Sequence, residues 1–148
     1  MKQTVLIYIE KDNKFLMLYR NKKDNDINKN KYIGIGGKVE ENETLDQALI
    51  REVKEETGLN LLSYSKSGIV YFIYNGDKEE MHVYTSSEFE GKVTECNEGE
   101  LYWVEKEKVL SLKLWEGDKY FLKKILNNET NYVISLYYEN DKLVKVVE

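Results

Sequence analysis

Residues 37 to 59 bring together glutamates, an arginine and glycines whose spacing could support chemistry on a negatively charged substrate. The stretch is GKVEENETLDQALIREVKEETGL. Glu55 and Glu56 follow Glu52 by three and four positions, so on a helix their carboxylates point from neighbouring parts of one surface. Like charges at this spacing repel each other, and a hard divalent cation with oxygen ligands, Mg²⁺ or Mn²⁺, would remove that cost. The spacing therefore predicts a metal site on a helix.

The sequence also predicts where this helix begins and ends. Thr44 and Gln47 fit a capping box, so the helix should begin at about Leu45. Gly58 stands where a left-handed residue would end it. Apolar residues at helical spacing predict a buried stripe, and they are Leu45, Ala48, Leu49 and Val53.

The chemistry that suits such a site is hydrolysis of a phosphoanhydride bond. Water must approach a phosphorus surrounded by negative oxygens, so metal ions neutralise the charge and a carboxylate removes the proton of the water. Arg51 can pair with Glu55 or reach back to Glu43. Directly before the helix, residues 34–38 (GIGGK) are expected to form a loop whose glycines let backbone groups approach metal or phosphate. Lys38 would supply a positive charge for a phosphate oxygen.

Length and composition limit the class of protein. The 148 residues suit one domain over 1–148, and no apolar run approaches the roughly 20 residues of a membrane span. The N-terminus lacks a signal-peptide pattern, and a lone Cys96 fits a reducing cytoplasm. His82 is also alone, which excludes a zinc site of His and Cys, and we expect it to be an ordinary strand residue. The net charge of −5 argues against a large nucleic-acid footprint, so we expect a cytoplasmic protein with neither a nucleic-acid nor a membrane partner.

Hydrophobic patterning predicts more strands than helices. The expected strands are 4–9, 15–19, 32–35, 68–75, 81–89, 101–104, 132–138 and 143–147. A second helix is expected over 118–126, and the polar residues 21–31 should form a mobile loop. Asn140 and Asp141 indicate a hairpin between the last two strands. The pattern predicts a mixed sheet between helices.

The stretch from 37 to 59 resembles the complete signature of the Nudix hydrolases. Its fixed positions are Gly37, Glu43, Arg51, Glu52, Val53, Glu55, Glu56, Gly58 and Leu59. The resemblance implies the α/β (α+β) class, with a Nudix α/β/α sandwich around a mixed β-sheet. It implies a Mg²⁺-dependent pyrophosphohydrolase of nucleoside diphosphate derivatives, in which Mn²⁺ can substitute. It also implies that Arg51 orients the carboxylates and that the Gly36 carbonyl helps Glu52, Glu55 and Glu56 to bind the metal.

Within the family, nearly the whole chain is similar to the MutT-type group, which hydrolyses oxidised purine nucleotides and thereby serves DNA repair. Glu98 falls where this group places a carboxylate that faces the metals, so the resemblance makes it catalytic and a metal ligand. The general base would be Glu52 or Glu98, and the sequence leaves both open. Arg20 is similar in place to a basic residue that contacts phosphate, and Gly37 and Lys38 are expected to bind substrate with it.

A segment further along the chain, residues 114–121 (LWEGDKYF), resembles the base pocket of the MutT-type group. Trp115 would stack on the base and Asp118 would hydrogen-bond its edge. Phe72 and Met81 match apolar pocket positions on two central strands.

Two residues depart from the pattern of the mammalian enzymes in this group. Ile33 stands where they have an asparagine that recognises the oxidised base, and Gly117 stands where they have the first aspartate of a pair. One buried polar contact can change discrimination by orders of magnitude, so the departures put the purine preference in question.

Three functions remain open from the sequence. The first is hydrolysis of oxidised purine triphosphates such as 8-oxo-dGTP to the monophosphate and pyrophosphate. The second is hydrolysis of another small nucleotide, such as a broad range of triphosphates, ADP-ribose or a dinucleoside polyphosphate; the lack of proline lowers the ADP-ribose option. The third is a binding module without catalysis, which the four retained signature glutamates disfavour. We expect a monomer or a homodimer.

Overall fold

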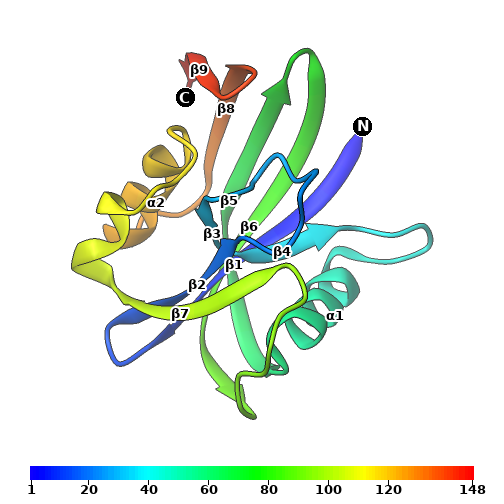
Figure 1. Cartoon of the computed structure of the whole chain (residues 1–148), viewed down its shortest axis with the longest axis vertical. Coiled ribbons are helices and arrows are strands. Elements are labelled where there is room, and N and C mark those ends of the chain that lie inside the picture. Colours follow the sequence, from blue (N-terminus) through cyan, green and yellow to red (C-terminus); the bar gives the residue numbers. More distant parts are fainter.

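The computed structural model describes residues 1–148, and its central feature is one mixed β-sheet with an α-helix on each side (Figure 1). The strands are β1 Lys2–Lys11, β2 Lys14–Arg20, β3 Tyr32–Ile33, β4 Ile35–Lys38, β5 Asn60–Tyr74, β6 Asp77–Glu90, β7 Gly99–Glu105, β8 Tyr132–Glu139 and β9 Lys142–Val147. The helices are α1 Leu45–Thr57, the 3₁₀ helix η1 Lys106–Ser111 and α2 Asp118–Leu126. None of them is long and apolar enough to cross a membrane.

The strand order explains how distant segments meet at one site. The main path is β3-β2-β1-β6-β5-β8-β9, while β4 also pairs with β1 and β7 with β2. The pairs β1–β6 and β5–β8 are parallel, and the other pairs are antiparallel, as the prediction of a mixed sheet requires. Thr4 lies opposite Met81, and Met81 lies opposite Val70. Directly opposed side chains share a face of the sheet, so these three residues face the same layer.

Each face of the sheet carries its own apolar core. On the α1 side, Ile7 packs in a cluster with Leu49 and Val53 of the helix. On the α2 side, Tyr8 packs in a second cluster with Phe121 of that helix. Because Ile7 and Tyr8 are adjacent and alternate in direction, β1 contributes to both cores. The layers form the predicted sandwich (Figure 1).

The boundaries predicted for α1 are confirmed. The Thr44 hydroxyl accepts a hydrogen bond from the Gln47 backbone N–H at 3.1 Å, and the Gln47 side chain accepts one from the Thr44 N–H at 2.9 Å. Gly58 ends the helix with a left-handed φ of 81°. Of the predicted stripe, Ala48, Leu49 and Val53 are buried, while Leu45 is partly buried against the same cluster.

The prediction of a glycine-rich loop before α1 was wrong, because residues 35–38 form strand β4 and pair with β1. A side chain at Gly36 would place its Cβ 1.9 Å from the Val5 carbonyl oxygen. At Gly37 the Cβ would lie 2.5 Å from the carboxylate of Glu52. The two glycines therefore allow the close packing of β1, β4 and α1 that holds this carboxylate against the strand.

Three further elements differ from the predictions, and the first is strand β6, which begins at Asp77 and not at residue 81. Strand β5 begins at Asn60, whereas the apolar pattern predicted a start at residue 68. The register with β6 shifts three times between Leu61 and Gly68, so these bulges break the regular alternation on which the prediction depends. Helix η1 was missed, since a single 3₁₀ element of six residues has little periodicity to detect. Helix α2 and the final hairpin have the predicted positions.

Candidate active site

Arg51 of α1 gathers the carboxylates at the centre of the site. Its Nε and Nη2 donate to the two oxygens of Glu43 at 2.7 and 2.9 Å, and its Nη1 donates to Glu52 at 2.6 Å. The same Nη1 lies 3.2 Å from Glu55, and Nη2 also donates to the Lys38 carbonyl oxygen at 3.0 Å. The hydrogen bonds from Arg51 hold the pKa of Glu43 at about 2. Both predicted partners of Arg51 are present, and its contact with Glu52 is additional.

Glu56 is the buried carboxylate of the group. The residue is 6% exposed, and its Oε2 accepts a hydrogen bond from the Gly36 backbone N–H at 3.3 Å. Its Oε1 is buried without a hydrogen-bond partner. Burial raises the pKa of Glu56 well above its ordinary value, and the nearby charges of Glu98 and Glu52 raise it further. A buried carboxylate oxygen without a donor is an arrangement that a bound cation would satisfy.

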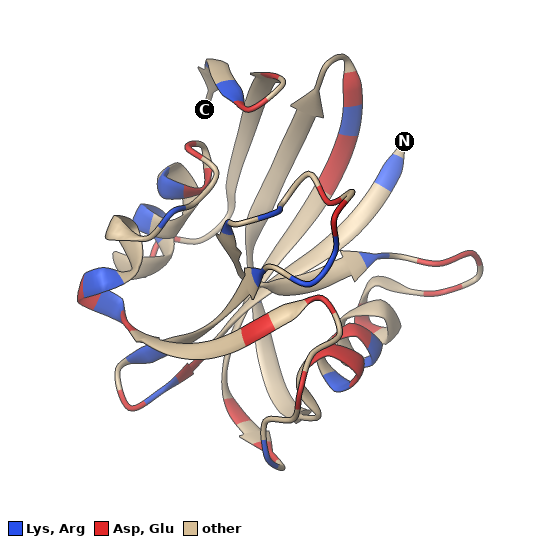
Figure 2. Ribbon diagram, viewed as in Figure 1, with Lys and Arg blue, Asp and Glu red and all other residues tan.

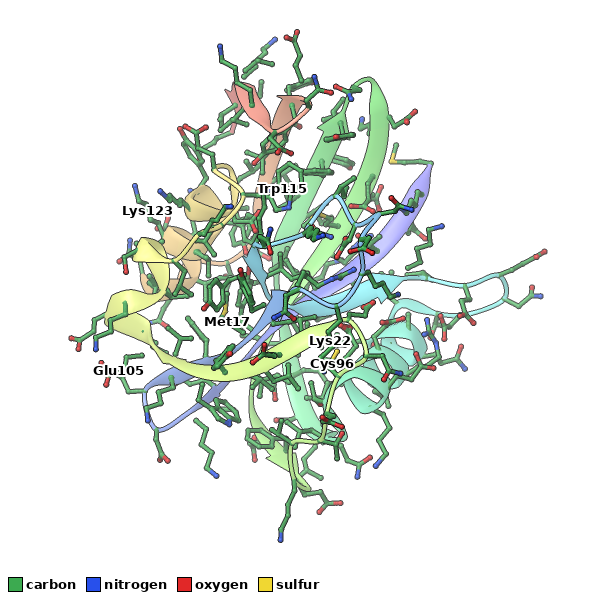
Figure 3. All side chains as sticks on the ribbon, in the orientation of Figure 1. Met17, Lys22, Cys96, Glu105, Trp115 and Lys123 are labelled. Carbon is green, nitrogen blue, oxygen red and sulfur yellow. The ribbon has the colours of Figure 1, made fainter.

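Glu98 reaches the same region from the turn before β7. Arg20, the last residue of β2, places its Nη1 3.5 Å from Glu98 and its Nε 2.7 Å from Asp26. Lys22 donates from Nζ to the Cys96 carbonyl oxygen at 2.9 Å, and these two residues lie beside each other in Figure 3. The segment after β2 and the turn carrying Glu98 are thus linked by ion pairs and hydrogen bonds.

The predicted metal ligands share one region, and three of the four glutamates, all except Glu56, are paired with arginines. In this arrangement no three Asp, Glu, His or Cys side chains lie close enough together to hold a metal ion. Arg51 contacts Glu52 and Glu55, and Arg20 contacts Glu98. Figure 2 shows acidic residues concentrated along α1 and in the loop that precedes it. The donor set consists of hard carboxylate oxygens, one of them buried without a partner, and this chemistry fits Mg²⁺ or Mn²⁺.

A cavity of about 280 Å³ opens beside this carboxylate region. It is lined by most of the residues that were predicted to bind metal or substrate, namely Arg20, Gly36, Gly37, Phe72, Met81, Trp115 and Asp118. The predicted metal- or substrate-binding residues that do not line it are the exposed Lys38 and the four glutamates Glu52, Glu55, Glu56 and Glu98. Ile33 lies on the wall, so the position where the mammalian enzymes have an asparagine is apolar here. The sheet therefore brings residues that are far apart in the sequence to one cavity.

Trp115 is packed into the wall of the cavity and is only 3% exposed. Its ring meets Phe72 edge-on, with centroids 5.3 Å apart, and Tyr138 in the same way at 4.9 Å. The Lys31 ammonium lies 4.5 Å from the centroid of the indole ring. In Figure 3 the residue lies beside the strands of the sheet. Its stacking on a base stays a prediction, and the small exposed area limits such stacking to the part of the ring that faces the cavity.

Asp118 begins α2 and is 7% exposed. Burial raises the pKa of Asp118 from its ordinary 3.8 to about 8, while the positive charge of Lys31 acts in the opposite direction. Near neutral pH the carboxyl group is therefore mainly protonated and can donate a hydrogen bond as well as accept one.

Gly117 has a steric reason for lacking the side chain found in the mammalian enzymes. A Cβ at this position would lie 2.6 Å from the Tyr138 hydroxyl and 2.7 Å from a methyl group of Leu136. The Gly117 backbone N–H donates to the same hydroxyl at 2.6 Å. Tyr138 thus occupies the space that a side chain would need.

Three polar residues are among those near the cavity that the sequence analysis missed, and they lie on its wall or over Trp115. Asn28 and Thr4 line the cavity, and Lys31 lies over Trp115. The Thr4 hydroxyl is buried without a partner. Asn28 and Lys31 belong to the polar segment 21–31, whose composition gives no indication of which side chains turn inward. Thr4 gave no signal because threonine is common in strands.

Comparison with known proteins identifies the class to which this site belongs. The sequence profile of the NUDIX domain matches residues 2–125, so the chain belongs to the family of the Nudix hydrolases. Such enzymes act on small-molecule nucleotides and generally use a divalent metal, typically Mg²⁺.

Individual relatives are similar over parts of their sequence. The chain is 33% identical over 90 residues to a Danio rerio protein named oxidized purine nucleoside triphosphate hydrolase, covering 60% of this chain and 58% of the relative. The Mus musculus protein of the same name is 31% identical over 98 residues, covering 65% of this chain and 63% of the relative. The chain thus spans less than two thirds of the length of these relatives.

Solved structures share the fold. A MutT protein from Bacillus halodurans superposes with a TM-score of 0.89 at 23% identity, covering 99% of this chain and 97% of that chain. A MutT protein from Methanosarcina mazei has a TM-score of 0.76 at 28% identity, covering 86% and 94% of the two chains. The predicted Nudix fold is therefore confirmed.

Proposed function

We propose that this enzyme hydrolyses purine nucleoside triphosphates, with oxidised forms such as 8-oxo-dGTP as the leading substrates, to the monophosphate and pyrophosphate. The observation that supports this most is that one cavity is lined by residues next to the carboxylates on one part of its wall and by apolar residues on another. Arg20 and Gly37 lie at the first, beside the carboxylates, and Phe72, Met81 and Trp115 line the second. The names of the zebrafish and mouse relatives support the same substrate class.

Glu52, Glu55, Glu56 and Glu98, with the Gly36 carbonyl, would hold the metal. When bound, Mg²⁺ or Mn²⁺ neutralises the charge that develops on the phosphate oxygens. Glu56 suits the role of an inner ligand because its Oε1 is buried and has no other partner. Arg51 fixes the direction of the Glu52 carboxylate through a hydrogen bond. The side chain of Glu55 is 61% exposed, so it can turn towards a bound metal ion.

Residues of the chain would perform the remaining steps of hydrolysis. Arg20 binds the phosphates from within the cavity, and Lys38 approaches them from outside it, because Lys38 is not part of the lining. Glu52 or Glu98 takes a proton from the water that attacks the β-phosphorus. The bond between the β-phosphorus and the oxygen that bridges it to the α-phosphate breaks, so the nucleoside monophosphate is the leaving group and the oxygen of the water ends in pyrophosphate.

On the apolar part of the wall, Phe72 and Trp115 provide aromatic surface for a purine, and Asp118 meets its edge. With a pKa of about 8, Asp118 is mainly protonated at neutral pH and can donate to a ring nitrogen or a carbonyl oxygen. The protonated form would be lost as the pH rises through 8, so base recognition should weaken in alkaline solution.

A hydrolysis panel with Mg²⁺ tests the proposal. It should include 8-oxo-dGTP, dGTP, dATP, a pyrimidine triphosphate, ADP-ribose and a dinucleoside polyphosphate. We expect the highest kcat/KM for 8-oxo-dGTP, with the monophosphate and pyrophosphate as products. Equal rates for all triphosphates would indicate a broad triphosphatase, and preference for ADP-ribose or a dinucleoside polyphosphate would refute the proposal.

The variant Trp115→Ala separates base recognition from phosphate chemistry. Loss of an aromatic partner for the base should lower kcat/KM for the best purine substrate by roughly 5- to 150-fold. The poorest triphosphates should change little. The variant Tyr102→Ala is a matched control, because Tyr102 is an exposed aromatic residue that does not line the cavity.

A further inference from the structure

Asn28 is the one side-chain amide on the cavity wall, and neither the signature nor the strand pattern indicated a role for it. It belongs to the segment between β2 and β3 and is half-buried. The apolar wall around it includes Ile33, Phe72 and Met81, which offer a base no hydrogen bond.

The direction of this amide follows from its partner. The indole Nε1 of Trp115 lies 2.6 Å from Asn28 Oδ1. An indole N–H can only donate, so the amide atom facing it must be the oxygen. The NH₂ group is thereby directed away from Trp115, and no atom of the chain accepts a hydrogen bond from it.

The backbone that carries Asn28 is tied to Arg20 through Asp26. The Asn28 N–H donates to Asp26 Oδ1 at 3.1 Å, and Asp26 Oδ2 accepts from Arg20 Nε at 2.7 Å. The Lys31 N–H donates to the Asn28 carbonyl oxygen at 3.0 Å. The position of Asn28 is therefore coupled to that of Arg20, which contacts the phosphates in the proposed function.

We propose that Asn28 determines base specificity by donating a hydrogen bond from its NH₂ group to a carbonyl oxygen on the edge of the purine. This inference rests on the proposed function. A donor at this point favours a purine with a carbonyl group and disfavours one with an amino group, because two donors cannot pair. Ile33 offers no donor from its position, so Asn28 supplies the amide from a different segment of the chain.

The test compares two triphosphates that differ at the base edge. dITP carries a carbonyl where dATP carries an amino group, and their phosphates are identical, so the ratio of their kcat/KM values cancels general effects on phosphate binding. Asn28→Asp keeps an oxygen for Trp115 and removes the amide donor, while Asn28→Ala removes both. Asn25→Asp is the matched control, since Asn25 is an exposed residue of the same segment outside the cavity.

We expect the kcat/KM of the wild type to be about 10-fold or more higher for dITP than for dATP. With dATP the NH₂ group of Asn28 would lack a hydrogen-bond acceptor, and a polar group without a partner lowers binding by about this factor. In both Asn28 variants the ratio should fall by about 10-fold, and in Asn25→Asp it should not change. A wild-type ratio near one, or a ratio unchanged in Asn28→Asp, would overturn the role of Asn28 while leaving triphosphate hydrolysis intact. Absence of any nucleoside triphosphate hydrolysis in the wild type would overturn both proposals.

Discussion

The buried carboxyl of Asp118 should make the free energy of unfolding depend on pH in a way that one substitution can isolate. Burial raises its pKa from 3.8 to about 8, so the folded state binds the proton more tightly than the unfolded state. The resulting stabilisation is fully present below pH 3.8 and is lost as the pH rises through 8. Asp118→Asn keeps the shape of the side chain and cannot ionise, so it should not show this loss.

The size of the effect follows from the two pKa values. Each pH unit between the two pKa values changes the free energy of unfolding by about 1.4 kcal/mol, so the full difference is on the order of 6 kcal/mol. Between about pH 5 and pH 8, the unfolding free energy of the wild type should fall by roughly 4 kcal/mol relative to Asp118→Asn.

Urea unfolding of both proteins at intervals of one pH unit measures this difference. Other titrating groups are common to both proteins, so their contributions cancel when the two free energies are subtracted. If the difference stays constant within about 0.5 kcal/mol across the range, Asp118 has an ordinary pKa and is not desolvated as described. Repeating the measurement at low salt would show whether Lys31 contributes to the pKa of Asp118. Its positive charge lowers this pKa, whereas burial raises it.

Four other substitutions have expected outcomes. Glu56→Gln should lower kcat at least about 100-fold without lowering the melting temperature, since it keeps the size of a buried side chain; near-normal turnover would exclude Glu56 as a metal ligand. The proposed general base is Glu52 or Glu98, and its replacement by Gln should reduce kcat with little change in KM and should alter the acid limb of the pH–rate profile. Unchanged pH–rate profiles in both Glu52→Gln and Glu98→Gln would exclude both residues as the base. Thr44→Ala should cost about 1 kcal/mol of unfolding free energy, measured in urea, because it removes the cap to Gln47; an unchanged free energy would contradict the importance of the capping box.

The sequence predicted those parts of the site that depend on local spacing. The cap at Thr44, the left-handed Gly58 and the pairing of Arg51 with Glu43 all involve residues close together in the chain, and all are present. The helix α2 was predicted because its apolar residues recur at helical spacing. Local periodicity and turn chemistry were sufficient for these elements.

The rest of the site depends on contacts between distant segments. Asn28 and Trp115 are 87 positions apart and meet only because the segment after β2 lies against the one that precedes α2. Gly36 and Gly37 suggested a loop, since the sequence does not show that β1 and α1 press on both sides of β4. Whether a polar residue in the segment 21–31 turns towards solvent or towards the cavity is decided by its partners, and composition does not identify them.

Trp115 can report on binding through its fluorescence, because it lies where the base should bind. Its indole N–H donates to Asn28 and its ring faces the ammonium group of Lys31, so a bound ligand would change its surroundings. The chain has two tryptophans, and Trp103 packs on Phe89 in the other core, on the α1 side. In a Trp103→Phe background, all tryptophan emission would come from Trp115. A ligand that displaces the ammonium of Lys31 from the ring, now 4.5 Å away, would change the field on the indole and shift its emission, so entry into the cavity could be followed in real time without any hydrolysis.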